Sequence, residues 1–280
     1  MKKVIVIGGL GMAGHVLTEQ LNELGSYELH SVARNEGRLI TKNLDVSDFN
    51  ALDVYLKETQ PDYVVNCVGV LVKGSDDDLC NAITLNSYLP HFLSKRGKEL
   101  GYKLVHISTD CVFSGKDGGY LESSYRDGDT NYARTKTLGE VINDRDLTIR
   151  TSIIGPELKL NGTGLMHWFL NQTDNVNGYS NAFWSGVTTI ELGKYIVKIL
   201  ESDLKGLIHL CPEGKISKLD LLLLMKKYWN RKMEIGAYSD YYCDKSIIST
   251  RKDQIYSVLG FDDMLKEAKD WVDLKKLYQY

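Results

Sequence analysis

Short apolar runs alternate with longer amphipathic segments through the first half of the chain. Within the runs, polar and apolar residues hardly alternate, which is typical of strands covered on both faces of a sheet. Strands separated by helical segments indicate βαβ units, so we expect an α/β fold with a doubly wound parallel sheet of the Rossmann type. Five strands are predicted, at Lys3–Ile7, Tyr27–Ala33, Tyr63–Cys67, Lys103–Ser108 and Asp146–Arg150.

Helical spacing of apolar residues predicts a first helix between the first two strands, from Met12 to Leu24. Val16, Leu17, Leu21 and Leu24 share one face, and Gly25 can adopt the left-handed conformation that often ends a helix. A second long helix is expected at Leu79–Leu100. Both helices would cover a face of the sheet.

The pattern becomes less regular after about residue 155, and no low-complexity linker separates the two parts. We predict a dinucleotide-binding domain at residues 1–155 and a smaller, mixed α/β substrate-binding lobe at residues 156–280, with some elements shared. Ser217 and Asp220 have the spacing of a capping box. The elements expected in the second part are helices at Thr163–Gln172, Thr189–Glu201, Lys218–Trp229 and Asp263–Tyr278, a strand at Leu207–Leu210 and a polar loop through Asn181.

Composition adds few constraints on function. The chain is 43% hydrophobic and 25% charged with a formal net charge of −3, so neither nucleic acid nor membrane is expected as a partner. The apolar run Val4–Ile7 is too short for a signal peptide, which favours a cytoplasmic location. Five cysteines without CxxC spacing and six histidines without HxxxH spacing indicate reduced thiols and no metal site. A homodimer is compatible with the sequence.

A glycine loop follows the first strand directly. Gly8, Gly11 and Gly14 would permit a tight turn, close approach of a pyrophosphate and close packing of helix on strand. Leu10 and Met12 lie within the same loop, which opens the first helix and offers its N–H groups to an anion. Glycine turns can also be purely structural, but this position favours a dinucleotide site.

Two residues bear on the choice of cofactor. Arg34 ends the second strand, where enzymes that prefer NADH usually carry an acid, and an arginine can pair with a 2′-phosphate. NADPH is therefore expected, with NADH as the alternative, unless Arg34 is only a solvated or adenine-stacked surface residue. Asp45 could accept a bond from the adenine amino group or simply cap a turn.

The candidate reacting centre combines a helix and a strand end. Tyr132 and Lys136 are four residues apart in a predicted helix, so their side chains share a face, and the ammonium is expected to lower the pKa of the phenol. Tyr132 could then donate a proton to a ketone. Thr109 lies at the carboxyl end of a strand, where its hydroxyl could bond the carbonyl oxygen. Alone, the Tyr-Lys spacing also occurs on ordinary solvated helices.

Five motifs follow one another along roughly the first 200 residues. They are the glycine loop at 8–14, Asn66–Gly69, Ser108–Phe113, Tyr132-x-x-x-Lys136 and Gly186–Glu191. Taken together, they resemble the extended short-chain dehydrogenases, and more narrowly the dTDP-4-dehydrorhamnose reductases.

The resemblance implies that Thr109 and Tyr132 surround the substrate carbonyl and that Lys136 contacts the nicotinamide ribose and the tyrosine. Asp110 would lie beside the substrate or cap a turn, and Cys111 replaces the Tyr that these reductases usually carry. The predicted cofactor-binding residues are Gly8, Leu10, Gly11, Met12, Gly14, Arg34, Asp45, Val46, Cys67, Val68, Gly69, Tyr132 and Lys136.

Two further residues complete the predicted substrate site. Asn86 resembles the Asn that supports the catalytic lysine through water, although a plain helix-face Asn is the alternative. Trp184 follows a polar loop and could line the sugar pocket, although such aromatics more often belong to a core.

The implied reaction is hydride transfer from NADPH to C4 of a 4-keto-6-deoxy sugar linked to a nucleoside diphosphate, in synthesis of surface polysaccharide. Another nucleotide-sugar reductase or an epimerase is a close alternative. A non-catalytic cofactor-binding subunit, like the regulatory subunit of methionine adenosyltransferase, is a rival from a different class. Tyr132 and Lys136 are both present, which favours an enzyme.

Overall fold

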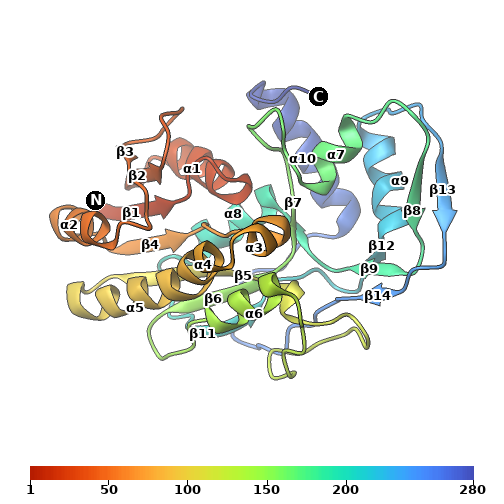
Figure 1. Ribbon diagram of the computed structural model, residues 1–280. Helices are drawn as coiled ribbons and strands as arrows, with labels where there is room; N and C mark the ends of the chain where they lie inside the picture. Colours follow the sequence, from red (N-terminus) through yellow and green to blue (C-terminus); the bar gives the residue numbers. More distant parts are fainter.

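A seven-stranded parallel sheet forms the centre of the computed structural model, which describes residues 1–280 (Figure 1). The strand order is β11-β6-β5-β4-β1-β2-β3, so the direction of the winding reverses between β1 and β4. This is the doubly wound Rossmann arrangement, which confirms the predicted fold class. The strands are β1 Lys2–Ile7, β2 Tyr27–Ala33, β3 Lys42–Asn43, β4 Tyr63–Asn66, β5 Lys103–Thr109, β6 Leu147–Thr151 and β11 Gly206–His209.

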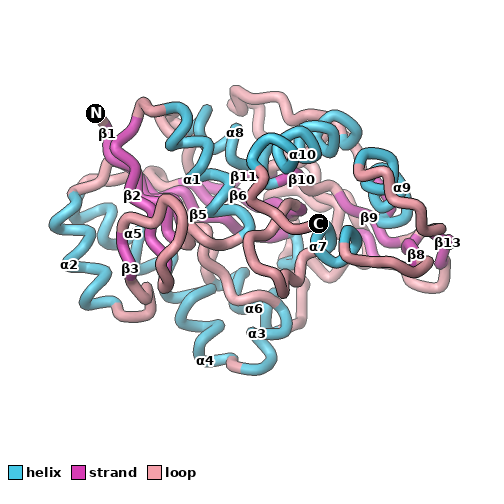
Figure 2. Tube along the Cα trace, turned by 90° about the horizontal axis from the view of Figure 1, so that it is seen from above, coloured by secondary structure: helices cyan, strands magenta, loops and turns pink.

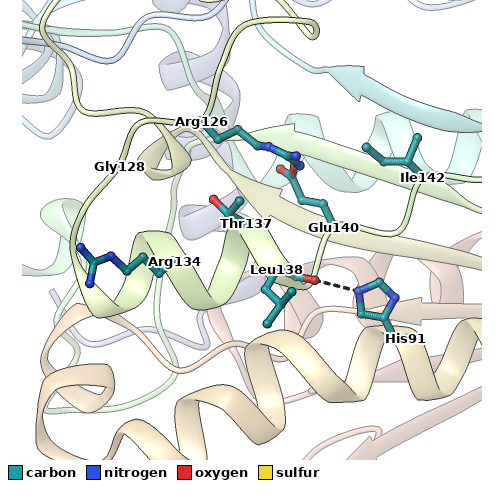
Figure 3. Close-up of a pocket in the computed structure, with 8 residues that line it drawn as sticks. All are labelled: His91, Arg126, Gly128, Arg134, Thr137, Leu138, Glu140 and Ile142. Atoms are coloured by element: carbon teal, nitrogen blue, oxygen red, sulfur yellow. Dashed lines mark hydrogen bonds and ion pairs between the residues drawn. The ribbon is translucent and has the colours of Figure 1, made fainter.

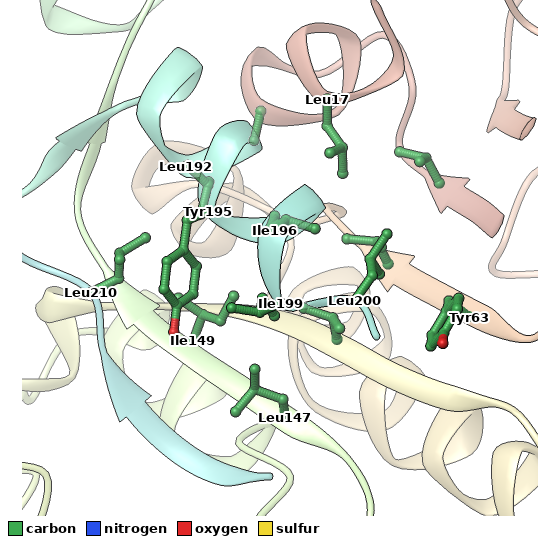
Figure 4. Packing of buried hydrophobic residues seen from close by; sticks show 14 of the residues in the cluster. Leu17, Tyr63, Leu147, Ile149, Leu192, Tyr195, Ile196, Ile199, Leu200 and Leu210 are labelled. Atoms are coloured by element: carbon green, nitrogen blue, oxygen red, sulfur yellow. The ribbon is translucent and has the colours of Figure 1, made fainter. Parts of the chain in front are cut away.

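Alternate residues of β1 pack into two different apolar cores, as a strand covered on both faces requires. Val4 and Val6 join a core with the helices α1 (Met12–Leu24) and α8 (Thr189–Ile199), whereas Ile5 and Ile7 face the opposite side. Figure 4 shows the first core, with Leu17 of α1 and a row of α8 side chains above β6. Of the face predicted for α1, Leu17 and Leu21 join this core, whereas Val16 packs in the core of the second lobe and Leu24 is exposed. The helices covering the opposite face are α2 Phe49–Thr59 and α5 Leu89–Leu100.

The long helix expected at Leu79–Leu100 is interrupted. It begins as α4 (Leu79–Ala82), continues as the π-helical segment η1 (Ile83–Tyr88) and ends as α5. Pro90 has no N–H to donate to the carbonyl of Asn86, four residues earlier, so regular α-helical bonding stops there. Gly139 lies against that carbonyl, where an added Cβ would approach the oxygen to 1.8 Å.

The second lobe has its own apolar core and three small sheets. Figure 2 shows it at the end of the molecule opposite to α2. Its helices begin and end within a few residues of the predicted bounds. The elements are α7 Leu165–Leu170, α9 Lys218–Tyr228, α10 Phe261–Lys275, β7 Ile153–Ile154, β8 Val176–Tyr179, β9 Ala182–Trp184, β10 Val187–Thr188, β12 Ile216–Ser217, β13 Ile235–Tyr238 and β14 Cys243–Asp244.

Two expectations for this lobe need correction. The predicted polar loop through Asn181 contains β8 and leads into β9, because β8 pairs in parallel with the distant β13. The capping box is half formed. The Ser217 hydroxyl accepts from the Asp220 N–H, as expected, but the Asp220 carboxylate accepts from the Ser217 hydroxyl and not from the Ser217 backbone N–H.

The boundary at residue 155 stays a prediction, and α8 and β11 return to the central sheet. None of the helices combines the length and apolar character that a membrane crossing requires.

Candidate active site

A cavity of 620 Å³ lies at the carboxyl end of the central sheet, where the winding reverses. The glycine loop, the ends of β4 and β5, helix α6 (Asn131–Leu138) and the segment from Glu157 to Gly164 surround it. The predicted site residues that line it are Leu10, Gly11, Met12, Cys67, Val68, Gly69, Thr109, Asp110, Cys111, Tyr132 and Lys136.

Three glycines of the loop each have a separate structural reason. Gly8 has a φ of +90°, a conformation that favours glycine. At Gly14 an added Cβ would come within 2.1 Å of the Gly8 carbonyl oxygen, so only glycine lets the helix start this close. Gly11 would place its Cβ near a single atom, the same oxygen at 3.2 Å, so a larger side chain there would extend into the cavity.

These features fit a dinucleotide pyrophosphate. No side chain caps the N-terminus of α1, which starts at the cavity and offers its N–H groups and partial positive charge to an anion. A nucleotide phosphate could therefore approach the backbone at Gly11.

The residues predicted for the adenosine end lie outside the lining of the cavity. Arg34 is exposed, and Asp45 accepts bonds from the N–H and the hydroxyl of Ser47 at 3.0 and 2.7 Å. These two bonds, followed by the charge of Arg34, hold the pKa of Asp45 below its ordinary value. Val46 is buried in the core. Their roles toward a cofactor stay predictions.

Lys136 is anchored by the backbone of β5. Its ammonium donates to the Ile107 carbonyl at 2.7 Å, and the side chain is almost fully buried. Burial lowers the pKa of Lys136 to about 8, against the opposing effect of the Glu140 charge. An ammonium has three donors, so two remain for other partners.

Tyr132 differs from expectation in its acidity. Burial raises its pKa above the ordinary value, with a smaller opposing effect of the Thr109 hydroxyl. We expected the ammonium of Lys136 to lower this pKa, but that ammonium is directed to the Ile107 carbonyl. Tyr132 therefore keeps its proton at neutral pH.

The turn after β5 holds the next three predicted residues. The Thr109 hydroxyl accepts from the Cys111 N–H at 3.1 Å and donates to Asp110 Oδ1 at 3.2 Å, which starts the short helix η2 (Asp110–Val112). Burial raises the pKa of Asp110, and it raises that of the Cys111 thiol to about 12, so this thiol stays neutral. All three residues line the cavity.

Asn86 and Trp184 are placed differently. Asn86 is inaccessible and bonds both backbone groups of Val70, and its amide also donates to the Thr135 hydroxyl at 3.1 Å. It thus connects the segment after β4 to the residue before Lys136 without lining the cavity. Trp184 is buried in the core of the second lobe, packed on Phe261.

The sequence reasoning missed a buried carboxylate behind this centre. Glu140 accepts from the Ser108 hydroxyl at 2.8 Å, from two nitrogens of Arg150 at 2.8 and 2.7 Å and from Arg126 at 2.8 Å. Burial alone would raise its pKa, but Arg150 and Arg126 lower it, so Glu140 is ionised at neutral pH. Its position four residues after Lys136 was the available signal.

Arg126 reaches Glu140 from a separate surface pocket of 550 Å³, shown in Figure 3. That pocket shares no lining residue with the active-site cavity. Its lining consists of His91, Arg126, Gly128, Arg134, Thr137, Leu138, Glu140 and Ile142. Glu140 therefore receives one partner from the surface and the others from the interior.

A family model described as RmlD substrate binding domain matches residues 1–239. The spore coat polysaccharide biosynthesis protein SpsK of Bacillus subtilis (strain 168) is 28% identical over 220 residues, which cover 76% of this chain and 75% of that protein. A dTDP-4-dehydrorhamnose reductase of Mycobacterium tuberculosis (strain H37Rv) is 32% identical over 135 residues, 45% of this chain and 43% of that enzyme.

Solved structures agree on the fold. A hypothetical dTDP-4-dehydrorhamnose reductase from Sulfolobus tokodaii superimposes with a TM-score of 0.80 at 26% identity, covering 93% of this chain and 98% of that one. The dTDP-4-dehydrorhamnose reductase of Bacillus anthracis, solved in complex with NADP, gives a TM-score of 0.81 at 21% identity. The superposition covers 96% of this chain and 98% of that one. At that identity the second likeness concerns the fold alone.

Proposed function

Because the chain belongs to the RmlD substrate binding domain family, we propose that it is an NADPH-dependent reductase of a 4-keto-6-deoxy sugar linked to a nucleoside diphosphate. The observation that carries this proposal is the meeting of Thr109, Tyr132 and Lys136 with the glycine loop around one cavity. Relatives named for spore coat polysaccharide biosynthesis and for dTDP-4-dehydrorhamnose reduction support the same reading.

NADPH, when bound, supplies the hydride that is added to C4 of the sugar. The glycine loop would hold its pyrophosphate, and Arg34 would be available to its 2′-phosphate. Lys136 has two donors left for the ribose next to the nicotinamide, since the third is held by Ile107.

Tyr132 acts as the general acid. As C4 gains the hydride, the carbonyl oxygen becomes an alkoxide and takes the phenolic proton, so the ketone becomes an alcohol. The raised pKa of Tyr132 keeps that proton in place until charge develops. Thr109 can orient the carbonyl oxygen, and its hydroxyl also favours the phenolate that remains, since it lowers the pKa of Tyr132.

The direct test follows the absorbance of reduced nicotinamide while the purified protein is incubated with NADPH and a panel of 4-keto nucleotide sugars. We expect oxidation of NADPH with at least one 4-keto-6-deoxy substrate. Binding of NADPH without oxidation by any member of the panel would overturn the proposal in favour of a regulatory subunit. The cytoplasmic location and a homodimer stay predictions from the sequence.

A further inference from the structure

Two lysines of the second lobe lie beside the turn that follows β5. Lys218 is the first residue of α9, and its ammonium lies 5.2 Å from the ring centre of Trp184. Lys245 follows β14, and its stem passes Gly115, where an added Cβ would come within 3.0 Å of the Lys245 Cγ. The absence of a side chain at Gly115 therefore leaves room for this lysine.

Strand pairing brings the two lysines together next to the cavity, although neither lines it. Ser217 and Asp244, the residues before them, both pair with Phe183 of β9, and the Asp244 N–H donates to the Gly115 carbonyl at 2.7 Å. Among the effects that lower the pKa of Asp110, the charges of these two lysines are the largest, and the charge of Lys245 also lowers the pKa of the Cys111 thiol. Asp110 and Cys111 line the cavity directly after Thr109. The two lysines thus approach the reacting centre from the side of the second lobe, whereas the glycine loop approaches it from the Rossmann domain.

These lysines carry more positive charge than the chain neutralises. Both are half-buried, and neither ammonium has an ion-pair or hydrogen-bond partner, whereas the neighbouring Lys215 pairs with Asp244. Asp110, which has no ion-pair partner, is the carboxylate whose charge acts on both lysines, and the Cys111 thiol is neutral. Half-buried ammonium groups without partners are costly, so an anionic ligand is the expected complement.

We propose that Lys218 and Lys245 bind the diphosphate of the nucleotide sugar whose keto group is reduced at Tyr132. This inference rests on the proposed function. C4 and C1 are opposite carbons of a pyranose ring, so a sugar with C4 at Thr109 and Tyr132 directs its C1-linked diphosphate away from them. With the ring over Asp110 and Cys111, the diphosphate would be directed toward the second lobe and its two ammonium groups, which suit phosphate oxygens. Cys111 is smaller than Tyr and leaves space for the ring.

A binding measurement tests this subsite separately from catalysis. Titration calorimetry of dTDP into the protein saturated with NADP⁺ uses a probe without a keto group, and dTMP serves as a probe with one phosphate fewer. We expect Lys218→Met and Lys245→Met each to weaken dTDP binding by about tenfold or more, the scale of a lost charge-assisted bond, and to weaken dTMP binding less. The matched control Lys215→Met removes a paired lysine of the same lobe and should stay within about twofold.

Two further measurements exclude a merely structural effect. Lys218→Arg and Lys245→Arg should recover most of the dTDP affinity, since they retain the charge, and NADPH affinity should be unchanged in all variants. In turnover assays the Met variants should raise KM for the nucleotide sugar with little change in kcat.

Unchanged dTDP affinity in both Met variants, with normal turnover, would overturn the subsite and leave the proposed function standing. Tight, lysine-dependent dTDP binding in a protein that reduces no keto sugar would overturn the function and retain the subsite.

Discussion

Replacing Glu140 by Gln tests whether the buried carboxylate supports the reacting centre. Its side chain is inaccessible, and the change would leave Arg150, which is 1% exposed, without its ionic partner. Removing one partner of a buried pair costs about 3–5 kcal/mol of the free energy of unfolding. The same change removes the carboxylate charge of Glu140, which raises the pKa of Lys136.

The sign of the catalytic effect follows from the role of Lys136 as a cation. Burial already lowers its pKa to about 8, and without Glu140 the pKa falls further. Activity that requires the ammonium is present below this pKa and lost as pH rises through it, so Glu140→Gln should move the alkaline loss of kcat to lower pH.

Urea unfolding and a pH profile of kcat measure the two effects. Arg126→Met is the matched control, because Arg126 is a partly exposed partner of Glu140 and its loss leaves Arg150 paired. The free energy of unfolding of that variant should fall by less than about 1 kcal/mol, as expected for loss of a partly exposed ion pair. If Glu140→Gln unfolds like the unmodified protein and keeps its pH profile, the reasoning is wrong.

Three further changes address the cofactor. Arg34→Ala should reduce the preference for NADPH over NADH by about 1–3 kcal/mol in equilibrium titrations, and equal affinities in the unmodified protein would contradict the assignment of Arg34. Gly11→Val should abolish NADPH binding while the circular dichroism spectrum stays native, because the side chain extends into the cavity; normal binding would make the loop purely structural. Lys136→Met should lower kcat and weaken NADPH binding, and a loss of neither would remove Lys136 from the site.

The parts predicted correctly from the sequence are those with a local signature. Continuous apolar runs marked six of the seven strands of the central sheet, all but the two-residue β3. The glycine loop follows from the positive φ of Gly8 and from the close approach of backbone at Gly14. The turn after β5 was recognised because residues at the carboxyl ends of parallel strands face the ligand crevice.

The parts that were missed depend on contacts between distant segments. The pairing of β8 with β13 joins residues about sixty positions apart, so the intervening pattern looked like a polar loop. The break at η1 depends on Pro90 together with the close approach of Gly139. The raised pKa of Tyr132 depends on burial and on the direction of the Lys136 side chain, neither of which the spacing of the two residues reveals.

The central claim is that Tyr132 donates the proton to the reduced carbonyl, and Tyr132→Phe tests it most directly. The variant keeps the ring and removes the hydroxyl, so unfolding free energy and NADPH affinity should change little. Turnover of a 4-keto-6-deoxy nucleotide sugar, followed by NADPH absorbance, should fall by about 100-fold or more, the usual scale for loss of a general acid. Turnover at the unmodified rate would contradict the mechanism, even if the protein proves to be a reductase.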